Sequence, residues 1–371
     1  MTFDPAAILA HIRRWVEHES PSDAPAAVNG MVDMIAADYA ALPVNMERVA
    51  GTEGCGDHLV VRSNWGQDAP GILLLSHSDT VHPIGFLQSR LPFRVEGDRA
   101  FGPGIYDMKG GLCLAFHAFR AVAEAGGTPL GITHLIVSDE EIGSPSSRPL
   151  IEKLGQAAKY VLVTEPARDG GRIVVGRKAT GDFLMTITGR ASHAGTHPQN
   201  GRSAIRELAH QILALEALND PAAGITVTVG VVRGGTRPNV IPEQAVAEID
   251  IRVPTVEAAE RLVPLILNRK AVTPDVTITI EGGLNRPPFE RTNAGTALFE
   301  HARTIAAEIG IDLQGMVTGG GSDGNFTAAH TATLDGLGID GEGAHTPNEQ
   351  VYISSIVPRT MLMKRLLETL R

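Results

Sequence analysis

The sequence predicts an α/β protein in which a domain with a largely parallel sheet is interrupted by a smaller α+β domain. In the first half of the chain, short apolar runs alternate with helical stretches, which is typical of parallel sheets covered by helices. After Gly176, strands and helices follow in the order β-α-β-β-α-β, which is typical of ferredoxin-like domains. The length of 371 residues also exceeds the usual size of one domain.

The first domain is predicted from an N-terminal amphipathic helix, three buried strands and one long helix. The strands are expected at the apolar runs 71–76, 132–138 and 160–164. Residues 108–125 are rich in Ala, Leu and Phe and stop at Gly126-Gly127, so we expect a helix that ends there. Because ligands bind at the carboxyl ends of the strands in such sheets, the residues that follow each strand are candidates for a site.

The inserted domain is predicted for residues 177–285. Its strands are expected at 183–188, 225–232, 245–253 and 276–280, and its helices at 203–217 and 256–267. This order predicts a four-stranded antiparallel sheet that carries two helices. The segments 1–176 and 286–371 together form the first domain, which resumes with a helix at 294–309.

The composition narrows the class of protein. Hydrophobic residues make up 43% and charged residues 20%, as in ordinary soluble globular proteins. A net charge of -10 argues against a nucleic-acid partner.

No apolar run approaches the roughly 18 residues of a membrane span, and the N-terminus lacks the pattern of a signal peptide. Cys55 and Cys113 are too few for a disulfide framework, so we expect both to be packed and the protein to be cytoplasmic.

Acidic and histidine-bearing phrases supply a set of candidate metal ligands. They contribute His77, Asp107, Glu140, Glu141, Glu165 and His345. Four of these residues come just after predicted strands and should meet at one edge of the sheet. Two imidazoles with several carboxylates are the ligand set of a two-metal hydrolytic site. Ligation by His and carboxylate without Cys favours two Zn²⁺ ions, with Co²⁺ or Mn²⁺ as alternatives.

Each phrase also has an ordinary structural explanation. Asp79, two residues after His77, either fixes the tautomer of that imidazole or caps a loop. Asp107 either bridges two cations or stands at a helix start, where acidic residues are common. Glu140 and Glu141 repel one another unless a cation lies beside them, but neighbouring surface acids are also common. The combination, more than any single phrase, indicates a hydrolase in which one glutamate binds metal and the other accepts a proton.

The inserted domain and the loops beyond it carry further polar groups. His193 follows a predicted strand, Asn239 and Arg252 lie on a strand and its approach loop, and residues 319–324 form a glycine-rich loop. The backbone N–H groups of such a loop bind anions, and it lacks the Lys of a phosphate-binding loop. Taken alone, each of these is better explained by a surface or packing role.

Together, and in this order, the phrases resemble the M20 family of metallopeptidases, most of all its glutamate carboxypeptidase (carboxypeptidase G2) branch. The resemblance extends from about residue 72 to residue 351 and is carried by SHSDTVHP, LPFRVEGDRAFGPGIYDMKGG, SDEEIGSPSSRPLIE, GRASHAG, NVIP, IDIR, GGGSDGN and GAHTPNEQVYIS. It implies a zinc-dependent exopeptidase-like α/β catalytic domain with an inserted ferredoxin-like α+β lid and dimerisation domain.

The resemblance implies a role for each matched residue of the metal centre. His77 and Glu165 hold one zinc ion, and Glu141 and His345 hold the other. Asp107 bridges the two ions, and Asp79 orients His77. Glu140 is the general base, which takes a proton from the bridging water and gives it to the leaving amine.

For the substrate, the resemblance implies contacts from the inserted domain. His193 of a neighbouring subunit stabilises the oxyanion, which implies a homodimer. Asn239 and Arg252 bind the C-terminal carboxylate of the substrate, with Gly320 of the glycine loop nearby. The branch's preference for glutamate implies a basic contact to a side-chain carboxylate, for which the candidates are Arg172, Arg177 and Arg286.

The function implied by the resemblance is hydrolysis of an amide bond next to a free carboxylate, with release of a C-terminal amino acid from a peptide or N-acyl amino acid. The alternative is an N-acyl-amino-acid deacylase or desuccinylase with the same metal centre, because the sequence does not decide which side of the amide is large. A metal-binding scaffold protein would lack the base, yet Glu140 is present.

Overall fold

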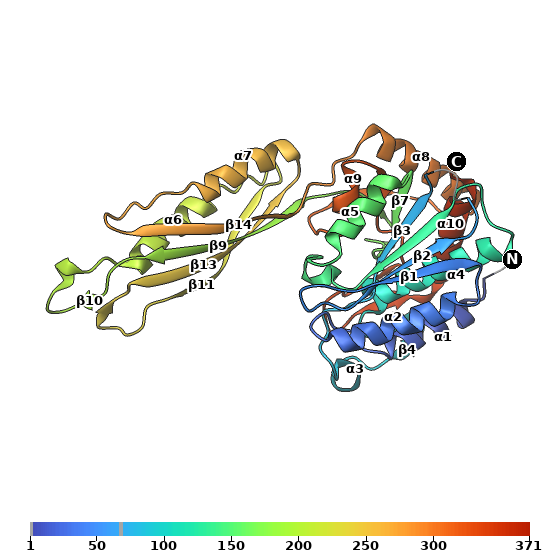
Figure 1. The fold of residues 1–371 in the computed structure, drawn as a ribbon, viewed down its shortest axis with the longest axis horizontal. Helices are drawn as coiled ribbons and strands as arrows, with labels where there is room; N and C mark the ends of the chain where they lie inside the picture. Colours follow the sequence, from blue (N-terminus) through green and yellow to red (C-terminus); the bar gives the residue numbers. More distant parts are fainter. Residues whose placement is uncertain (1–2, 67–69) are drawn as a thin grey trace. The chain divides into compact units, whose positions relative to one another are not determined.

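The computed structural model describes residues 3–66 and 70–371, and the chain divides into two compact units (Figure 1). The first comprises Met1–Gly176, Arg291–Val317 and Ser322–Arg371, and the second Arg177–Glu290 and Thr318–Gly321. The sequence predicts that the insert ends at residue 285, whereas residues 286–290 and 318–321 belong to the second unit. The reason is backbone pairing, because Arg177 exchanges hydrogen bonds with Phe289 and the Lys178 amide donates to the Thr318 carbonyl.

The first unit is built on a mixed sheet that, among the described residues, has six strands. Their order is β1 (Val44–Val49), β2 (His58–Ser63), β6 (Ile132–Val137), β3 (Ile72–His77), β7 (Tyr160–Val163) and β16 (Ala332–Leu334). The pairs β6–β3, β3–β7 and β7–β16 are parallel, whereas β1–β2 and β2–β6 are antiparallel. This arrangement confirms the predicted α/β class and places the three apolar runs of the sequence side by side.

The central sheet is covered by α1 (Pro5–Val16), α2 (Pro25–Tyr39), α4 (Gly110–Glu124), α5 (Arg148–Ala157), α8 (Asn293–Glu308), α9 (Gly324–Ala328) and α10 (Ile356–Thr369). The short helix α3 (Phe86–Ser89) has no buried residue. Proline stands in the first turn of α1, α2 and α5, where its missing N–H costs nothing and its fixed φ suits a helix. None of the helices described is long and apolar enough for a membrane span.

Both faces of the central sheet are buried. Ile72 and Leu74 of β3 belong to a hydrophobic cluster with α1, α2, α4, α8 and α10, whereas Leu73 and Leu75 belong to a second cluster with residues of α5 and α9. Burying each of these side chains contributes on the order of 2 kcal/mol. The unbroken apolar run of this strand therefore follows from its position between two helical layers. Cys113 is buried as expected, whereas Cys55 is partly exposed.

Two small sheets complete the loops of this part of the chain. One has the order β17 (Gly341–Glu342), β18 (Gln350–Tyr352), β5 (Arg99–Phe101) and β4 (Arg94–Glu96). The other pairs β15 (Gly315–Thr318) with β8 (Ile173–Arg177). The first of these brings the segment around residue 350 next to the segment that precedes α4.

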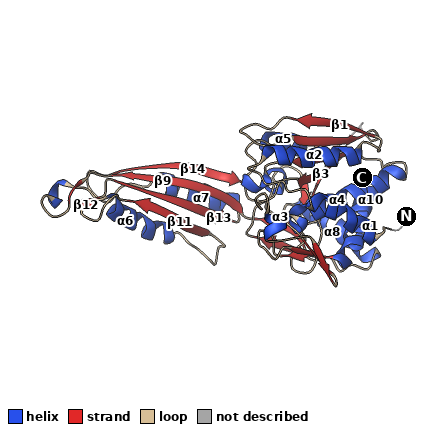
Figure 2. Ribbon diagram, turned by 90° about the horizontal axis from the view of Figure 1, so that it is seen from below, coloured by secondary structure: helices blue, strands red, loops and turns tan. Residues whose placement is uncertain are grey.

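The second unit has the predicted β-α-β-β-α-β order (Figure 2). Its elements are β9 (Ala179–Thr188), α6 (Ala204–Glu216), β11 (Thr226–Gly234), β13 (Gln244–Val253), α7 (Val256–Leu267) and β14 (Thr277–Arg286). The strands pair antiparallel in the order β11-β13-β9-β14. Alternate residues of β13 are buried in one hydrophobic cluster with both helices. A ribbon of β10 (Ser192–His193) and β12 (Val240–Ile241) extends from this sheet.

Candidate metal centre

Three neighbouring strands deliver side chains to one edge of the central sheet. His77 is the last residue of β3, Glu140 and Glu141 begin a helical turn shortly after β6, and Glu165 lies two residues beyond β7. Strand β3 pairs in parallel with both β6 and β7. Because neighbouring strands lie about 4.8 Å apart, the four side chains converge at the carboxyl end of the sheet.

Asp107 lies between two histidines. It belongs to the segment Ile105–Lys109 that precedes α4, and its Oδ1 lies 3.2 Å from His77 Nε2. Its Oδ2 lies 3.4 Å from His345 Nε2, and that nitrogen lies 3.1 Å from Glu141 Oε2. The two oxygens of one carboxylate therefore face two different imidazoles.

The remaining carboxylates surround His77. Glu165 Oε1 lies 3.6 Å and Glu140 Oε2 lies 4.0 Å from its Nε2 atom. The possible ligand atoms form two overlapping groups, one of His77, Glu140 and Glu165 and one of His77, Asp107 and Glu141, with all atoms of a group within 4.8 Å of one another. The structure thus brings together the six residues that the sequence singles out.

Asp79 supports this cluster from behind. The Nδ1 atom of His77 lies 3.0 Å from the backbone oxygen of Asp79 and 3.4 Å from its Oδ1, so Nδ1 donates to Asp79 and Nε2 is the nitrogen that faces the other carboxylates. The Asp79 carboxylate also accepts from the backbone amides of Glu140 and Glu141, both at 3.2 Å, and from Ser22 Oγ at 2.6 Å. Asp79 therefore orients His77 and the acidic pair together.

The electrostatics of the cluster fit a bound cation. Burial, reinforced by repulsion from Asp107, raises the pKa of Glu141 to about 8. Its Oε1 atom is buried and has no hydrogen-bond partner among the described residues. Four carboxylates face two imidazoles here, and a buried carboxylate without a counter-charge is costly. Oxygen and imidazole donors at this spacing suit Zn²⁺ and similar divalent ions.

The carboxylates of the cluster also raise the pKa of both histidines. Hydrogen bonds to Asp107 and Glu141 raise the pKa of His345 to about 11. Burial opposes a charge on His77, but the hydrogen bonds to Asp107 and Asp79 outweigh it and raise the pKa of His77 well above its ordinary value. His345 also has a φ of 64°, in the left-handed region that non-glycine residues adopt uncommonly.

Glu349 is a supporting residue that the sequence analysis missed. Its buried side chain accepts hydrogen bonds at 2.9 Å from the backbone amides of Gly104, Tyr106 and Asp107. His82 Nε2 lies 2.7 Å from the same carboxylate. Glu349 thereby fixes the backbone that presents Asp107. The only signal in the sequence is its place four residues after His345.

In the second unit, His193 and Asn239 lie together at the β10–β12 ribbon. His193 pairs with Val240, and the Ala194 amide donates to the Asn239 carbonyl at 3.0 Å. The exposed ring of His193 accepts at Nδ1 from the backbone amides of residues 195 and 196, at 3.1 and 3.2 Å. Since Nδ1 accepts, the neutral ring carries its proton on Nε2, which is a donor that faces solvent.

The other predicted substrate contacts gather at the opposite end of the second unit. Arg252 and Arg286 both stand opposite Thr180 in the sheet. The Arg177 guanidinium donates to the carbonyls of Gly320 and Gly321 at 3.1 and 3.2 Å, and a Cβ built on Gly321 would lie 2.7 Å from Arg286 Cδ. The glycine loop and two buried arginines therefore form one cluster.

Asn239 and Arg252 are not brought together within one chain. Asn239 precedes β12, whereas Arg252 lies eight residue steps beyond the start of β13 at Gln244, a length of about 27 Å in an extended strand. One substrate carboxylate therefore cannot contact both side chains of a single copy, and the prediction that both residues bind it stays a prediction. Arg252 also holds Asp250 through its Nε and Nη2 atoms at 3.0 and 2.6 Å, and Arg172 is exposed in a turn of the first unit.

Comparison with known proteins agrees with this geometry. The model of peptidase family M20/M25/M40 matches residues 73–369. Carboxypeptidase G2 of a Pseudomonas species is 34% identical over 83% of this chain and 75% of its own length, and succinyl-diaminopimelate desuccinylase of Delftia acidovorans is 28% identical over 84% of each chain. In fold, the chain is similar to a tripeptidase of Staphylococcus aureus, with a TM-score of 0.80 at 21% identity over 99% of each chain.

Proposed function

The chain belongs to peptidase family M20/M25/M40 and is a metal-dependent hydrolase, and on that premise we propose that it cleaves an amide bond next to a free carboxylate and releases a C-terminal amino acid. The observation that carries the proposal is the position of Asp107, whose two oxygens face His77 and His345 at 3.2 and 3.4 Å. A carboxylate held between two imidazoles suits a pair of cations a few ångströms apart.

We assign the ligands from these contacts. His77 and Glu165 would hold one Zn²⁺, Glu141 and His345 would hold the other, and Asp107 would be a ligand shared by both, with Co²⁺ or Mn²⁺ as substitutes. When bound, such cations polarise the amide carbonyl and lower the pKa of water. The unpartnered Oε1 of Glu141 supports its assignment as a ligand rather than a base.

Glu140 is the general base of this proposal. Its Oε2 atom lies 4.0 Å from His77 Nε2, and its backbone amide is held by Asp79. This position lets the carboxylate accept a proton from the attacking water and donate it to the leaving amine. The same position also lies within reach of the first cation, so metal content distinguishes a base from a ligand.

His193 donates to the developing oxyanion. Two backbone amides occupy its Nδ1 atom, so its Nε2–H is the group available for the substrate, as an oxyanion donor requires. The separation of Asn239 from Arg252 along β13 means that one substrate carboxylate contacts both only if they come from two copies of the chain. We therefore propose a homodimer in which His193 and Asn239 of one subunit serve the partner's metal centre.

The end of the second unit that carries Arg177, Arg252, Arg286 and Gly320 is proposed to bind substrate carboxylates. Arginine presents a planar fork that matches a carboxylate, and backbone N–H groups of a glycine loop add further donors. Arg177 and Arg286 are buried beside that loop, which favours a substrate that carries more than one carboxylate, such as a C-terminal glutamate.

The second candidate is an N-acyl-amino-acid deacylase or desuccinylase that uses the same centre. The 28% identity to a desuccinylase over 84% of the chain favours it. The two functions differ in which side of the amide bears the recognised carboxylate, and substrates that differ only there separate them.

The test is an amide-hydrolysis screen with matched substrates. We would compare N-benzoyl-glutamate, its α-carboxamide and an N-succinyl-alkylamine. The proposal expects turnover of the first, loss of at least tenfold in kcat/KM for the carboxamide, and little turnover of the succinyl amide. The reverse order would select the desuccinylase function. Chelation should abolish activity and Zn²⁺ or Co²⁺ restore it, and activity that is indifferent to chelators would overturn the proposed centre.

A further inference from the structure

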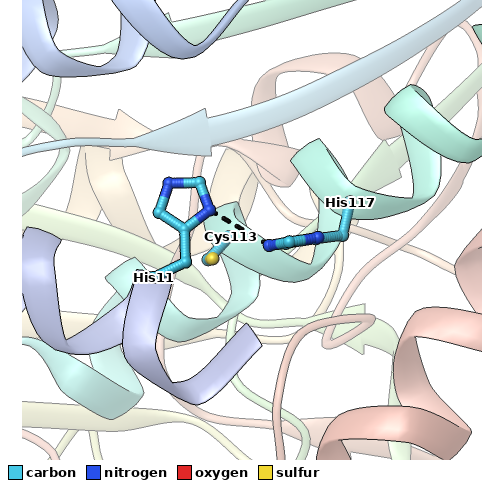
Figure 3. A group of neighbouring side chains, drawn as sticks. All are labelled: His11, Cys113 and His117. Atoms are coloured by element: carbon cyan, nitrogen blue, oxygen red, sulfur yellow. Dashed lines mark hydrogen bonds between the residues drawn. The ribbon is translucent and has the colours of Figure 1, made fainter. Parts of the chain in front are cut away.

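A second group of metal-ligating side chains lies between α1 and α4. It consists of His11, Cys113 and His117, and Figure 3 shows the two rings with the sulfur atom next to the contact between them. Cys113 and His117 are buried and His11 is half-buried. None of the three belongs to the candidate metal centre, and the proposed hydrolysis leaves them without a role.

The backbone brings the three side chains together. Cys113 and His117 are four residues apart on α4, a spacing that places both on the same face of a helix. His11 approaches from α1, and its Nδ1 atom lies 3.0 Å from His117 Nε2. One ligand atom from each residue lies within 4.8 Å of the other two. In a tetrahedral zinc site the ligand atoms stand roughly 3.3–3.7 Å apart, so only small shifts are needed to enclose an ion.

We propose that His11 Nδ1, His117 Nε2 and Cys113 Sγ bind one Zn²⁺ ion at a site separate from the hydrolytic centre. Thiolate and imidazole together select zinc or a similarly soft cation over Mg²⁺ and Ca²⁺. Coordination replaces the hydrogen bond between the two rings by two metal–nitrogen bonds. The Cys113 thiol loses its proton when the metal–sulfur bond forms, so one proton is released for each ion bound.

Asp38 prepares His11 for this role. Its Oδ2 atom lies 3.0 Å from His11 Nε2 and 3.0 Å from Trp15 Nε1, and it also contacts Arg14. Arg14 Nη2 also lies 2.8 Å from His11 Nε2. Because the Nδ1 atom of His11 accepts from His117 Nε2 at 3.0 Å, the proton of the neutral His11 ring is on Nε2, where Asp38 accepts it and leaves the Nδ1 lone pair toward His117 and Cys113. Carboxylates that accept from the second nitrogen of a ligating histidine orient the ring and strengthen metal binding.

Arg120 opposes binding and supplies a test. Its Nη2 atom lies 3.0 Å from His117 Nδ1, and because a guanidinium only donates, His117 carries its proton on Nε2, the atom that would coordinate. Metal binding moves that proton to Nδ1 and releases Arg120. The arginine side chain is 41% exposed, and Glu124, one helical turn away at 3.8 Å, is its alternative partner.

A surface cavity of about 600 Å³ adjoins the site. It is lined by His11 together with Arg14, Asp38, Phe116, Arg120 and Glu124, whereas Cys113 and His117 are buried. His11 is therefore the ligand that connects the cavity with the site. A zinc ion with one thiolate ligand carries a net charge of about +1, and zinc sites with three protein ligands take water as the fourth.

The experiment is Co²⁺ titration of the whole protein in a thiol-free reductant, followed by near-ultraviolet absorption. A sulfur-to-cobalt charge-transfer band reports this site alone, because the ligands of the hydrolytic centre include no cysteine. We expect the band in the wild type and in Cys55→Ser, and its loss in Cys113→Ser. A wild type without the band, or a band that persists in Cys113→Ser, would overturn the proposal.

Two further variants test the proposed ligands even if Cys113→Ser fails to fold. His11→Gln should weaken Co²⁺ binding at this band at least tenfold. Arg120→Gln removes the competitor for His117 Nδ1 and should strengthen binding several-fold. Weaker binding in Arg120→Gln, or unchanged binding in His11→Gln, would contradict the assigned ligands. The charge-transfer band should persist in Glu141→Gln, so this measurement does not depend on the hydrolytic centre.

Discussion

The carboxylate of Glu349 accepts a hydrogen bond at 2.9 Å from the backbone amide of Asp107, a residue 242 positions earlier in the chain. The same carboxylate also accepts from the amides of Gly104 and Tyr106. Three backbone donors and one buried acceptor hold the loop that carries Asp107. Support of this kind for metal ligands is worth about 10–100-fold in metal affinity or activity.

We therefore predict that Glu349→Gln lowers metal affinity by roughly one to two orders of magnitude. The amide keeps one oxygen acceptor but turns an N–H toward backbone donors, which leaves at least one of them unsatisfied at a cost of about 1–3 kcal/mol. Isothermal titration with Zn²⁺ measures the loss. Glu342→Gln, in the exposed position of β17, is the matched control and should leave affinity unchanged. Equal affinities in the two variants would refute a positioning role for Glu349.

Substitutions of Glu140 and Glu141 should have different effects on kcat and on metal content. Glu140→Gln is expected to lower kcat by roughly 10²–10⁴-fold while the metal content per chain stays constant. Glu141→Gln is expected to lose metal, because its side chain pairs with His345 at 3.1 Å. Elemental analysis and steady-state kinetics of both variants show which glutamate is the base and which is a metal ligand. If Glu140→Gln also loses metal, Glu140 is a ligand and the base lies elsewhere.

His193→Ala is predicted to lower kcat by about 10²–10³-fold with a small change in KM, as for the loss of one oxyanion donor. His197→Ala, also exposed in the same loop, is the control. Hybrids of His193→Ala and Glu140→Gln chains test donation between subunits. Random mixing makes half of the dimers mixed, each with one intact site of two, so roughly a quarter of wild-type activity should return. No recovery would place His193 at the centre of its own chain.

The stability of the first unit should depend on pH through His134. This ring is buried between the hydroxyls of Tyr39 and Ser76, each at 2.7 Å, and desolvation lowers the pKa of His134 from 6.5 to about 3. The unfolded chain takes up a proton below its higher pKa, so stability that is present above about pH 6.5 is lost as the pH falls toward 3, by roughly 1.4 kcal/mol per pH unit.

Urea unfolding of wild type and His134→Gln at pH 7 and pH 5 measures this dependence. Glutamine keeps a donor and an acceptor for the two hydroxyls but does not titrate, so the free energy of unfolding should fall less in the variant. The exposed His210→Gln should behave as wild type. A pH dependence that is unchanged by His134→Gln would show that other groups dominate.

Sequence patterns were sufficient where local chemistry decides the structure. The apolar run of β3 predicts a strand buried on both faces, and His77 then follows at its end. The predicted end of β14 at residue 280 was wrong. Gly282-Gly283 interrupts the alternating pattern of the sequence, but the pairing of β14 with β9 continues to Arg286. The pairing of Arg286 with β9 and the hydrogen bonds between Phe289 and Arg177 place residues 286–290 in the second unit.

Long-range relationships were beyond the sequence. Nothing in the sequence near Glu349 indicates that its carboxylate accepts from the backbone amide of Asp107. The separation of Asn239 from Arg252, by contrast, follows from strand length alone. The resemblance implied that His193 comes from a neighbouring subunit, but it did not say which copy of the chain supplies Asn239.

The interruption of the first unit by the second also has a consequence for biosynthesis. Asp107 and Glu141 are synthesised early, but His345 and Glu349 leave the ribosome only after the whole intervening unit has been translated. The nascent chain therefore carries an incomplete acidic cluster for much of its synthesis, and Asp107 lacks the acceptor that fixes its backbone until Glu349 has been added. A chain that stops between residues 335 and 344 contains the strands of the central sheet but lacks both His345 and Glu349.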